Sequence, residues 1–198
     1  MGVKLVSASA GSVEIVAPTT ASNYTATMPA GTGNVVVNGI NSSIVSGTSV
    51  ASTSGTSIDF TSIPSWVKRI TVMLNGVSTN GTTDIIVQIG SGSVTTTGYL
   101  TQRGFIQATS ANASTSGTAS MVMLTSAGAS SVMMGHIVLT NISSNSWVAS
   151  ANFSQPASSL VGFSAGSIAL GGVLDRVRIT TVNGTDTFDA GSINILYE

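Results

Sequence analysis

Residues 63–81 read IPSWVKRITVMLNGVSTNG, and this stretch decides the fold class. Every second residue between positions 70 and 74 is apolar, which places these side chains on one face of a strand covering 67–75. Asn-Gly pairs follow at 75–76 and 80–81, and both residue types accept the positive φ angles of tight turns. The stretch therefore predicts a half-buried β-strand that ends in a turn.

The same alternation recurs along the rest of the chain. The predicted strands cover 67–75, 84–90, 98–107, 120–125, 133–142, 147–154, 160–170, 174–182 and 193–197. Strands that follow one another at a spacing of roughly 8–12 residues are typical of a sandwich or barrel. For a chain of 198 residues we predict an all-β, jelly-roll-like antiparallel β-sandwich.

The composition independently predicts an all-β protein. Charged residues make up 7% of the chain, whereas a soluble domain usually has about 25%. Ser, Thr, Gly, Asn and Ala take their place, and Ser, Thr and Asn compete with the helical backbone for hydrogen bonds. Val and Thr fit a pleated sheet better than a helix.

Charge and cysteine content exclude several classes of protein. The formal net charge is −1 and there are no cysteines, so we expect no nucleic-acid partner, no disulfide framework and no thiolate metal site. The best membrane candidate, 160–174, is shorter than the ~20 residues of a spanning helix and is broken by glycines. We therefore expect no membrane partner.

The pattern divides the chain into three parts. Residues 1–45 hold short β-like runs (SVEIV, YTATM and NVVV) that are too widely spaced to bury much on their own, so we predict an extended N-terminal arm. Residues 46–57 read SGTSVASTSGTS and are typical of a flexible linker. Residues 58–198 form the predicted sandwich.

One long segment lacks ionised side chains. Residues 104–174 contain no Asp, Glu, Lys or Arg, and His136 is the only imidazole there. Exposed sheet without charges tends to associate with other sheet surfaces. We therefore expect a permanent oligomer, although a coat of Ser, Thr and Asn side chains could also keep such a surface soluble.

Two residues invite a catalytic interpretation. Residues 162–166 read GFSAG and match the nucleophile-elbow pattern, which needs a helix after the candidate nucleophile Ser164. The following SIALGGVL is short and contains two glycines, and His136 precedes the serine, opposite to the order of that fold. We predict a structural role for both residues, and no catalytic, cofactor-binding or metal-ligating residue is assigned.

Asp186 and Asp189 lie close together in TDTFD and could act as an acid–base pair or as calcium ligands. Two carboxylates are few for the six to eight oxygens that calcium requires. Turn chemistry after Asn183-Gly184 is the simpler interpretation. Whether calcium binds here stays open.

The few basic residues could form a patch or be rim charges on solvent-facing strands. Four of them are Lys68, Arg69, Arg176 and Arg178, with Asp59, Asp84 and Asp175 as candidate partners. Six basic residues against seven acidic ones favour rim charges. Trp66 could plug the end of the sandwich or serve as a contact anchor.

Three segments resemble virion proteins of tailed bacteriophages. They are 11–37 (GSVEIVAPTTASNYTATMPAGTGNVVV), 58–82 (IDFTSIPSWVKRITVMLNGVSTNGT) and 176–198 (RVRITTVNGTDTFDAGSINILYE). The resemblance implies a β-sandwich, often trimeric, with an N-terminal arm that attaches to the particle and with no catalytic residues.

Two roles compete within that resemblance. The first is a trimeric capsid decoration (cement) protein, whose arm binds the major capsid protein or another virion protein and stabilises the head. The second is a short tail or head fibre whose C-terminal domain contacts a host receptor. The compact size and the lack of a shaft repeat favour decoration, so we expect a non-enzymatic structural protein located on the virion.

Overall fold

The computed structural model describes residues 3–6, 12–15, 44–108, 110–129 and 131–198. The chain divides into two compact units, Met1–Val37 and Asn38–Glu198. In the first unit, β1 (Val3–Val6) and β2 (Ser12–Ile15) form an antiparallel hairpin in which Val3 is opposite Ile15. Of the β-like runs predicted for the arm, SVEIV contains β2, whereas YTATM and NVVV lie outside the described residues.

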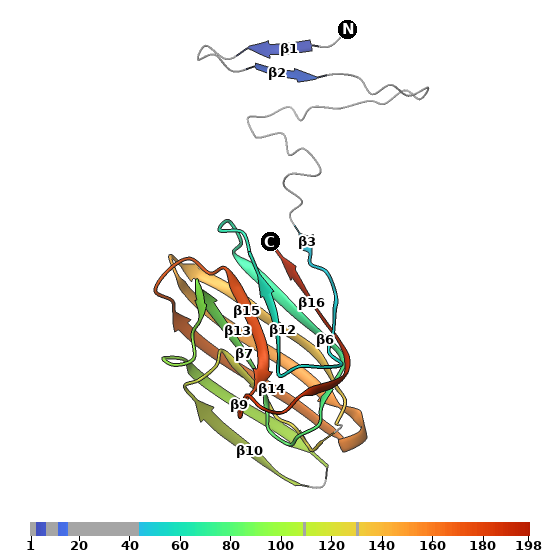
Figure 1. The fold of residues 1–198 in the computed structure, drawn as a ribbon. Coiled ribbons are helices and arrows are strands. Elements are labelled where there is room, and N and C mark those ends of the chain that lie inside the picture. Colours follow the sequence, from blue (N-terminus) through green and yellow to red (C-terminus); the bar gives the residue numbers. More distant parts are fainter. Residues whose placement is uncertain (1–2, 7–11, 16–43, 109, 130) are drawn as a thin grey trace, which may run out of the picture. The chain divides into compact units, whose positions relative to one another are not determined.

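The second unit is a sandwich of two antiparallel β-sheets (Figure 1). In pairing order, the larger sheet contains β10 (Ser110–Gly117), β9 (Leu100–Gln107), β14 (Leu160–Ala169), β13 (Ser146–Gln155), β12 (Met133–Ser143), β6 (Arg69–Thr79), β16 (Phe188–Tyr197) and β3 (Val45–Ser46), and β4 (Val50–Ala51) also pairs with β16. The smaller sheet contains β11 (Val122–Leu124), β7 (Ile85–Ser91), β15 (Arg176–Thr181) and β5 (Ser57–Thr61), and β8 (Ser93–Val94) pairs with β7. A 3-10 turn, Pro156–Ser158, joins β13 to β14. The all-β sandwich predicted from the sequence is confirmed.

Two neighbouring connections carry the chain between the sheets. From β6 to β7 it passes from the larger sheet to the smaller one, and from β15 to β16 it passes back. β6 pairs with β16 and β7 pairs with β15, so the two crossings lie side by side. The meander β12–β13–β14 and the hairpin β9–β10 instead remain in the larger sheet, which they extend well beyond β6.

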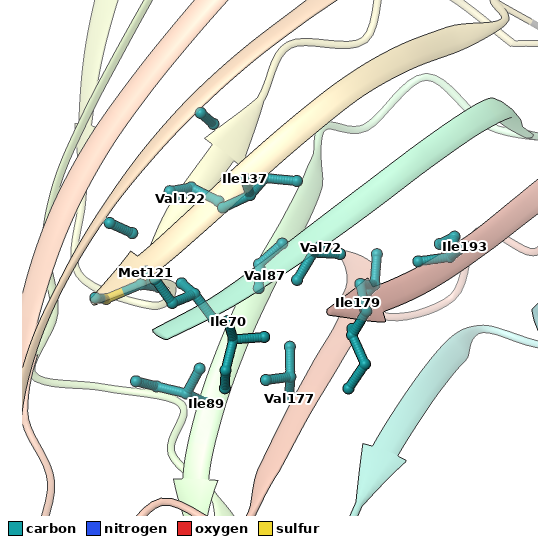
Figure 2. Packing of buried hydrophobic residues seen from close by; sticks show 14 of the residues in the cluster. Ile70, Val72, Val87, Ile89, Met121, Val122, Ile137, Val177, Ile179 and Ile193 are labelled. Carbon is teal, nitrogen blue, oxygen red and sulfur yellow. The ribbon is translucent and has the colours of Figure 1, made fainter. Parts of the chain in front are cut away.

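The core lies between the two sheets and consists mainly of β-branched side chains. Figure 2 shows Ile70, Val72, Ile137 and Ile193 of the larger sheet beside Val87, Ile89, Val177 and Ile179 of the smaller one, and all are buried. These residues occupy alternate positions of their strands, as the period-2 pattern predicted. Side chains that are stiff at χ1 pack well on a pleated surface, which explains the preference for Val and Ile.

The structure differs from the sequence prediction where the alternation fails. β10 has the sequence SANASTSG, which carries no strand pattern, and it becomes a strand by pairing with β9. β16 begins at Phe188, five residues before the predicted start at 193. Register shifts near Gly191 interrupt the alternation there, so the sequence pattern did not show this part of the strand. A Cβ on Gly191 would lie 2.4 Å from a backbone atom of Gly76. Within the predicted linker, Val50–Ala51 pairs with β16.

One aromatic ring depends on a glycine in the neighbouring strand. Phe153 of β13 is buried and lies opposite Gly162 of β14 on the inner face. A Cβ added to Gly162 would lie 2.0 Å from Cζ of Phe153. The ring therefore occupies the space that a side chain at position 162 would need.

We expect Gly162→Ala to lower the free energy of unfolding by about 1–3 kcal/mol, the usual cost of overpacking a core. Urea denaturation followed by circular dichroism measures the change. Gly171→Ala is the matched control, because its Cβ would meet nothing within 4 Å, and its effect should stay within about 0.5 kcal/mol. Equal losses in the two variants would contradict the proposed role of Gly162.

Candidate interaction surface

Each arginine of the described residues is paired with a carboxylate of the same chain. Arg178 makes a two-pronged contact with Asp59 on the adjacent strand, with Nε 2.7 Å and Nη2 2.9 Å from the two carboxylate oxygens. Arg176 donates to Asp175 (2.7 Å), and Arg69 lies 3.2 Å from Glu198. These three pairs are at least partly exposed, as expected of rim charges. The pKa of Asp175 lies below its ordinary value because Arg176 donates a hydrogen bond to the carboxylate.

The fourth pair lies between the sheets. Arg103 of β9 points inward, and its Nη2 lies 2.8 Å from Oδ2 of Asp84, just before β7. Both side chains are mostly buried, at 15% and 16% exposure. Arg103 also donates to the hydroxyl of Thr125, and Asp84 accepts a hydrogen bond from the backbone N–H of Ser126 (3.0 Å). This cluster ties the larger sheet to the smaller one where the apolar core ends.

Ser164 belongs to the same polar contact between the sheets. It lies in the middle of β14 and is buried. Its hydroxyl donates to the carbonyl of Gln102 (3.0 Å) and accepts from the N–H of Met123 (3.2 Å). A nucleophile elbow needs an exposed serine on a strand-to-helix turn, and residues 162–166 instead continue straight along one strand. The structural role predicted for Ser164 agrees with this geometry.

Removing one member of the Arg103–Asp84 pair leaves the other charge without a partner in a poorly hydrated site. We expect Arg103→Met and Asp84→Leu each to lower the free energy of unfolding by about 3 kcal/mol. The double variant should regain at least half of the summed loss, since two apolar side chains leave no unpaired charge. Chemical denaturation of the four proteins measures this cycle, and additive losses would argue against a coupled pair.

The second carboxylate cluster stabilises loops. Asp186 accepts hydrogen bonds from the N–H (3.2 Å) and hydroxyl (2.7 Å) of Thr83 and from Nδ2 of Asn183 (2.6 Å). Asp189 accepts from the hydroxyl of Ser78 instead. A Cβ on Gly81 would lie 2.0 Å from the Asp186 carboxylate, so the β6–β7 loop approaches it closely. Within the described part of the chain, no group of three or more His, Cys, Asp or Glu side chains could hold a metal ion.

The pKa of Asp186 is below its ordinary value of 3.8, because Asn183 and Thr83 donate hydrogen bonds to the ionised carboxylate. A depressed folded-state pKa contributes stability above the unfolded pKa, and this contribution is lost as the pH falls through the folded value. Asp186→Asn should therefore unfold at a lower temperature than the wild type at pH 7. The difference in melting temperature should narrow below about pH 4. Thermal scans from pH 7 to pH 2 measure it, and a constant difference would refute the contribution of this carboxylate.

The remaining candidates from the sequence lie on the surface. His136 is exposed on the outer face of β12, opposite Asn152. Trp66 is half exposed and tilted against Tyr197, with ring centroids 5.9 Å apart, so it is not a buried plug. Lys68 lies 3.4 Å from the side-chain oxygen of Asn141. The structure does not bring these residues together into a cleft.

The outer face of the larger sheet has a part with charged side chains and a part without them. Arg69 and Glu198 lie at β6 and β16. The outward positions of the next five strands, β12, β13, β14, β9 and β10, hold no Asp, Glu, Lys or Arg among the described side chains, since Arg103 points inward, and His136 of β12 is the only imidazole among them. We call the outward positions of these five strands the uncharged face.

Large apolar side chains are exposed on the uncharged face. They are Leu100, Ile106, Met134, Val161 and Phe163. Val161 pairs directly with Ile106, and Phe163 lies opposite Gly104. The Phe163 ring covers that glycine, since a Cβ on Gly104 would lie 2.7 Å from the ring. The sequence patterns did not lead us to predict this apolar patch. A strand with apolar residues on both of its faces, as at 160–170, is the signal that could have revealed it.

Two hollows lie over β9 within the uncharged face. One, of about 760 Å³, is lined by residues that include Leu100, Ser116 and Ser167. The other, of about 670 Å³, is lined by residues that include Ile106 and Phe163. Gln102 and Ala165 line both hollows, so the two are adjacent, and we call them together the groove over β9. Its lining combines apolar side chains with neutral hydroxyl and amide groups, and Arg103, which also borders it, points its side chain inward.

The uncharged face ends at an edge strand. β10 pairs with β9 and closes the sheet order on that side, and it lies at the lower edge of the view in Figure 1. Its sequence contains neither a charged residue nor a proline. Natural sheets usually protect their edges with such residues, so β10 is an edge that could accept another strand.

No family model, curated protein or solved structure matches the chain. No helix within the described ranges has the length and apolarity needed to cross a membrane.

Proposed function

We propose that the chain is a non-enzymatic structural protein of a bacteriophage virion, a trimeric capsid decoration protein that binds and stabilises the head. The observation that carries the proposal is the uncharged face with its exposed apolar side chains. An uncharged, partly apolar sheet surface of this extent is typical of a surface that becomes covered in an assembly.

Two of the three segments that resemble virion proteins, 58–82 and 176–198, are neighbours in the fold. Segment 58–82 contains most of β5 and all of β6, and segment 176–198 contains β15 and β16. β5 pairs with β15 in one sheet, and β6 pairs with β16 in the other. The two segments thus form one contiguous part of the sandwich, which supports interpreting them as a single module.

In this proposal the two units have different tasks. The sandwich packs against its own copies, and the N-terminal segment attaches to the major capsid protein or another virion protein. Extended segments bind by adding strands to sheet edges, where main-chain hydrogen bonds provide affinity. Three linked attachments per trimer then multiply weak individual contacts.

Quantitative mass spectrometry of purified particles tests the proposal. Hundreds of copies of the chain per particle are expected for a decoration protein, because it repeats over the head. A few dozen copies or fewer would identify a tail or head fibre that contacts the host surface. Absence of the chain from purified particles would refute a virion role.

Deletion of residues 1–37, the first compact unit, should abolish binding to particles that lack the protein. The circular dichroism spectrum and melting temperature of the remaining domain should be retained. The matched control is the full chain added to the same particles, with bound protein measured by sedimentation. Full occupancy by the shortened chain would show that the N-terminal unit is not the attachment segment.

A further inference from the structure

The ion pairs and loops described above do not account for the groove over β9 and the exposed apolar side chains beside it. Side chains there are exposed although they are large and apolar, with Leu100 at 73% and Phe163 at 51%. Burying such side chains yields about 25 cal/mol per Å² of apolar surface, so a partner that covers them gains free energy.

We propose that a second copy of this chain covers the uncharged face, with Ile106, Val161 and Phe163 at the centre of the contact. The inference rests on the assembly of copies in the proposed function and adds to it the surface through which the copies meet. It names no contact with the capsid, which the N-terminal segment would make.

Charge complementarity selects the occupant. A partner that places a Lys, Arg, Asp or Glu side chain on this face would desolvate that charge where no opposite charge can pair with it. A copy of the chain brings the same uncharged face, and therefore no such cost. Around a threefold axis, the part of each subunit nearest the axis meets the same part of the other two copies, so an uncharged face can pack there against itself.

The polar side chains of the face suit the same partner. Gln102, Ser116 and Ser167 line the groove with neutral donors and acceptors. Neutral hydroxyl and amide groups can hydrogen-bond to their equivalents on another copy, since each contains both donors and acceptors. The charged outer positions at β5, β6, β15 and β16 then remain in water, where their ion pairs are already formed within one chain.

The test introduces a charge among the exposed apolar side chains of the proposed contact. Val161→Lys places an ammonium group where no carboxylate is present, so it should dissociate the full-length protein into single chains of about 19.8 kDa. Light scattering coupled to size-exclusion chromatography measures the mass, and the wild type should elute at a multiple of that value. Ile106→Lys is the second variant, because Ile106 pairs with Val161 across the strands.

Val182→Lys is the matched control. Val182 lies after β15, outside the uncharged face, and is 54% exposed, compared with 58% for Val161. Its mass should equal that of the wild type. Because both test side chains are more than half exposed, the lysines open no cavity in the core, and circular dichroism confirms the fold of each variant.

Three outcomes would overturn the inference: a monomeric wild type, an unchanged oligomer in both face variants, or dissociation of the Val182→Lys control as well. None of these outcomes decides the virion role, which the copy count on purified particles tests separately. Conversely, absence from particles together with dissociation of the face variants would retain the interface and refute the proposed function.

Discussion

The structure depends on the burial of stiff, β-branched side chains between two sheets. Val and Ile at alternate positions of β6, β7, β15 and β16 form the centre of this contact, and the chain has no cysteine that could add a covalent constraint. Beyond β6 the apolar core continues beneath β12, β13 and β14. Near β9 polar contacts between the layers join it, among them Arg103 with Asp84 and Ser164 with Gln102 and Met123. Buried polar groups require partners, so this region specifies the alignment of the sheets more strictly than apolar packing would.

The sequence predicted the sandwich because its pattern and composition agree. Period-2 alternation located the strands around Ile70, Val177 and Ile195, and these positions are buried as predicted. It did not reveal β10, since Ser, Ala, Asn and Thr carry no facial preference and the strand exists through its partner β9. The uncharged segment 104–174 was visible in the sequence, but the groove over β9 was not. That groove requires the register that places Phe163 opposite Gly104 and Val161 opposite Ile106, and register is set by tertiary pairing.

Ser164 and Asp186, which were candidates for catalysis and for metal binding, both have a structural role in the fold, and for related reasons. Short motifs such as GFSAG occur readily in a chain rich in Gly and Ser, and the backbone context decides their meaning. Ser164 has both its donor and its acceptor capacity engaged by backbone groups, and Asp186 accepts three hydrogen bonds from Thr83 and Asn183. In both places the polar group stabilises the approach of segments that are distant in sequence.

The internal pairing of the arginines has a consequence for the environments in which the protein can exist. At physiological ionic strength the Debye length is about 8 Å, and it shortens to about 3 Å at 1 M salt. Screening weakens exposed ion pairs, which contribute at most about 1 kcal/mol each, and it leaves apolar burial intact. With charge confined to a few short-range pairs, neither dilution nor brine removes a major source of cohesion, so the stability of the fold is expected to depend only weakly on salt concentration.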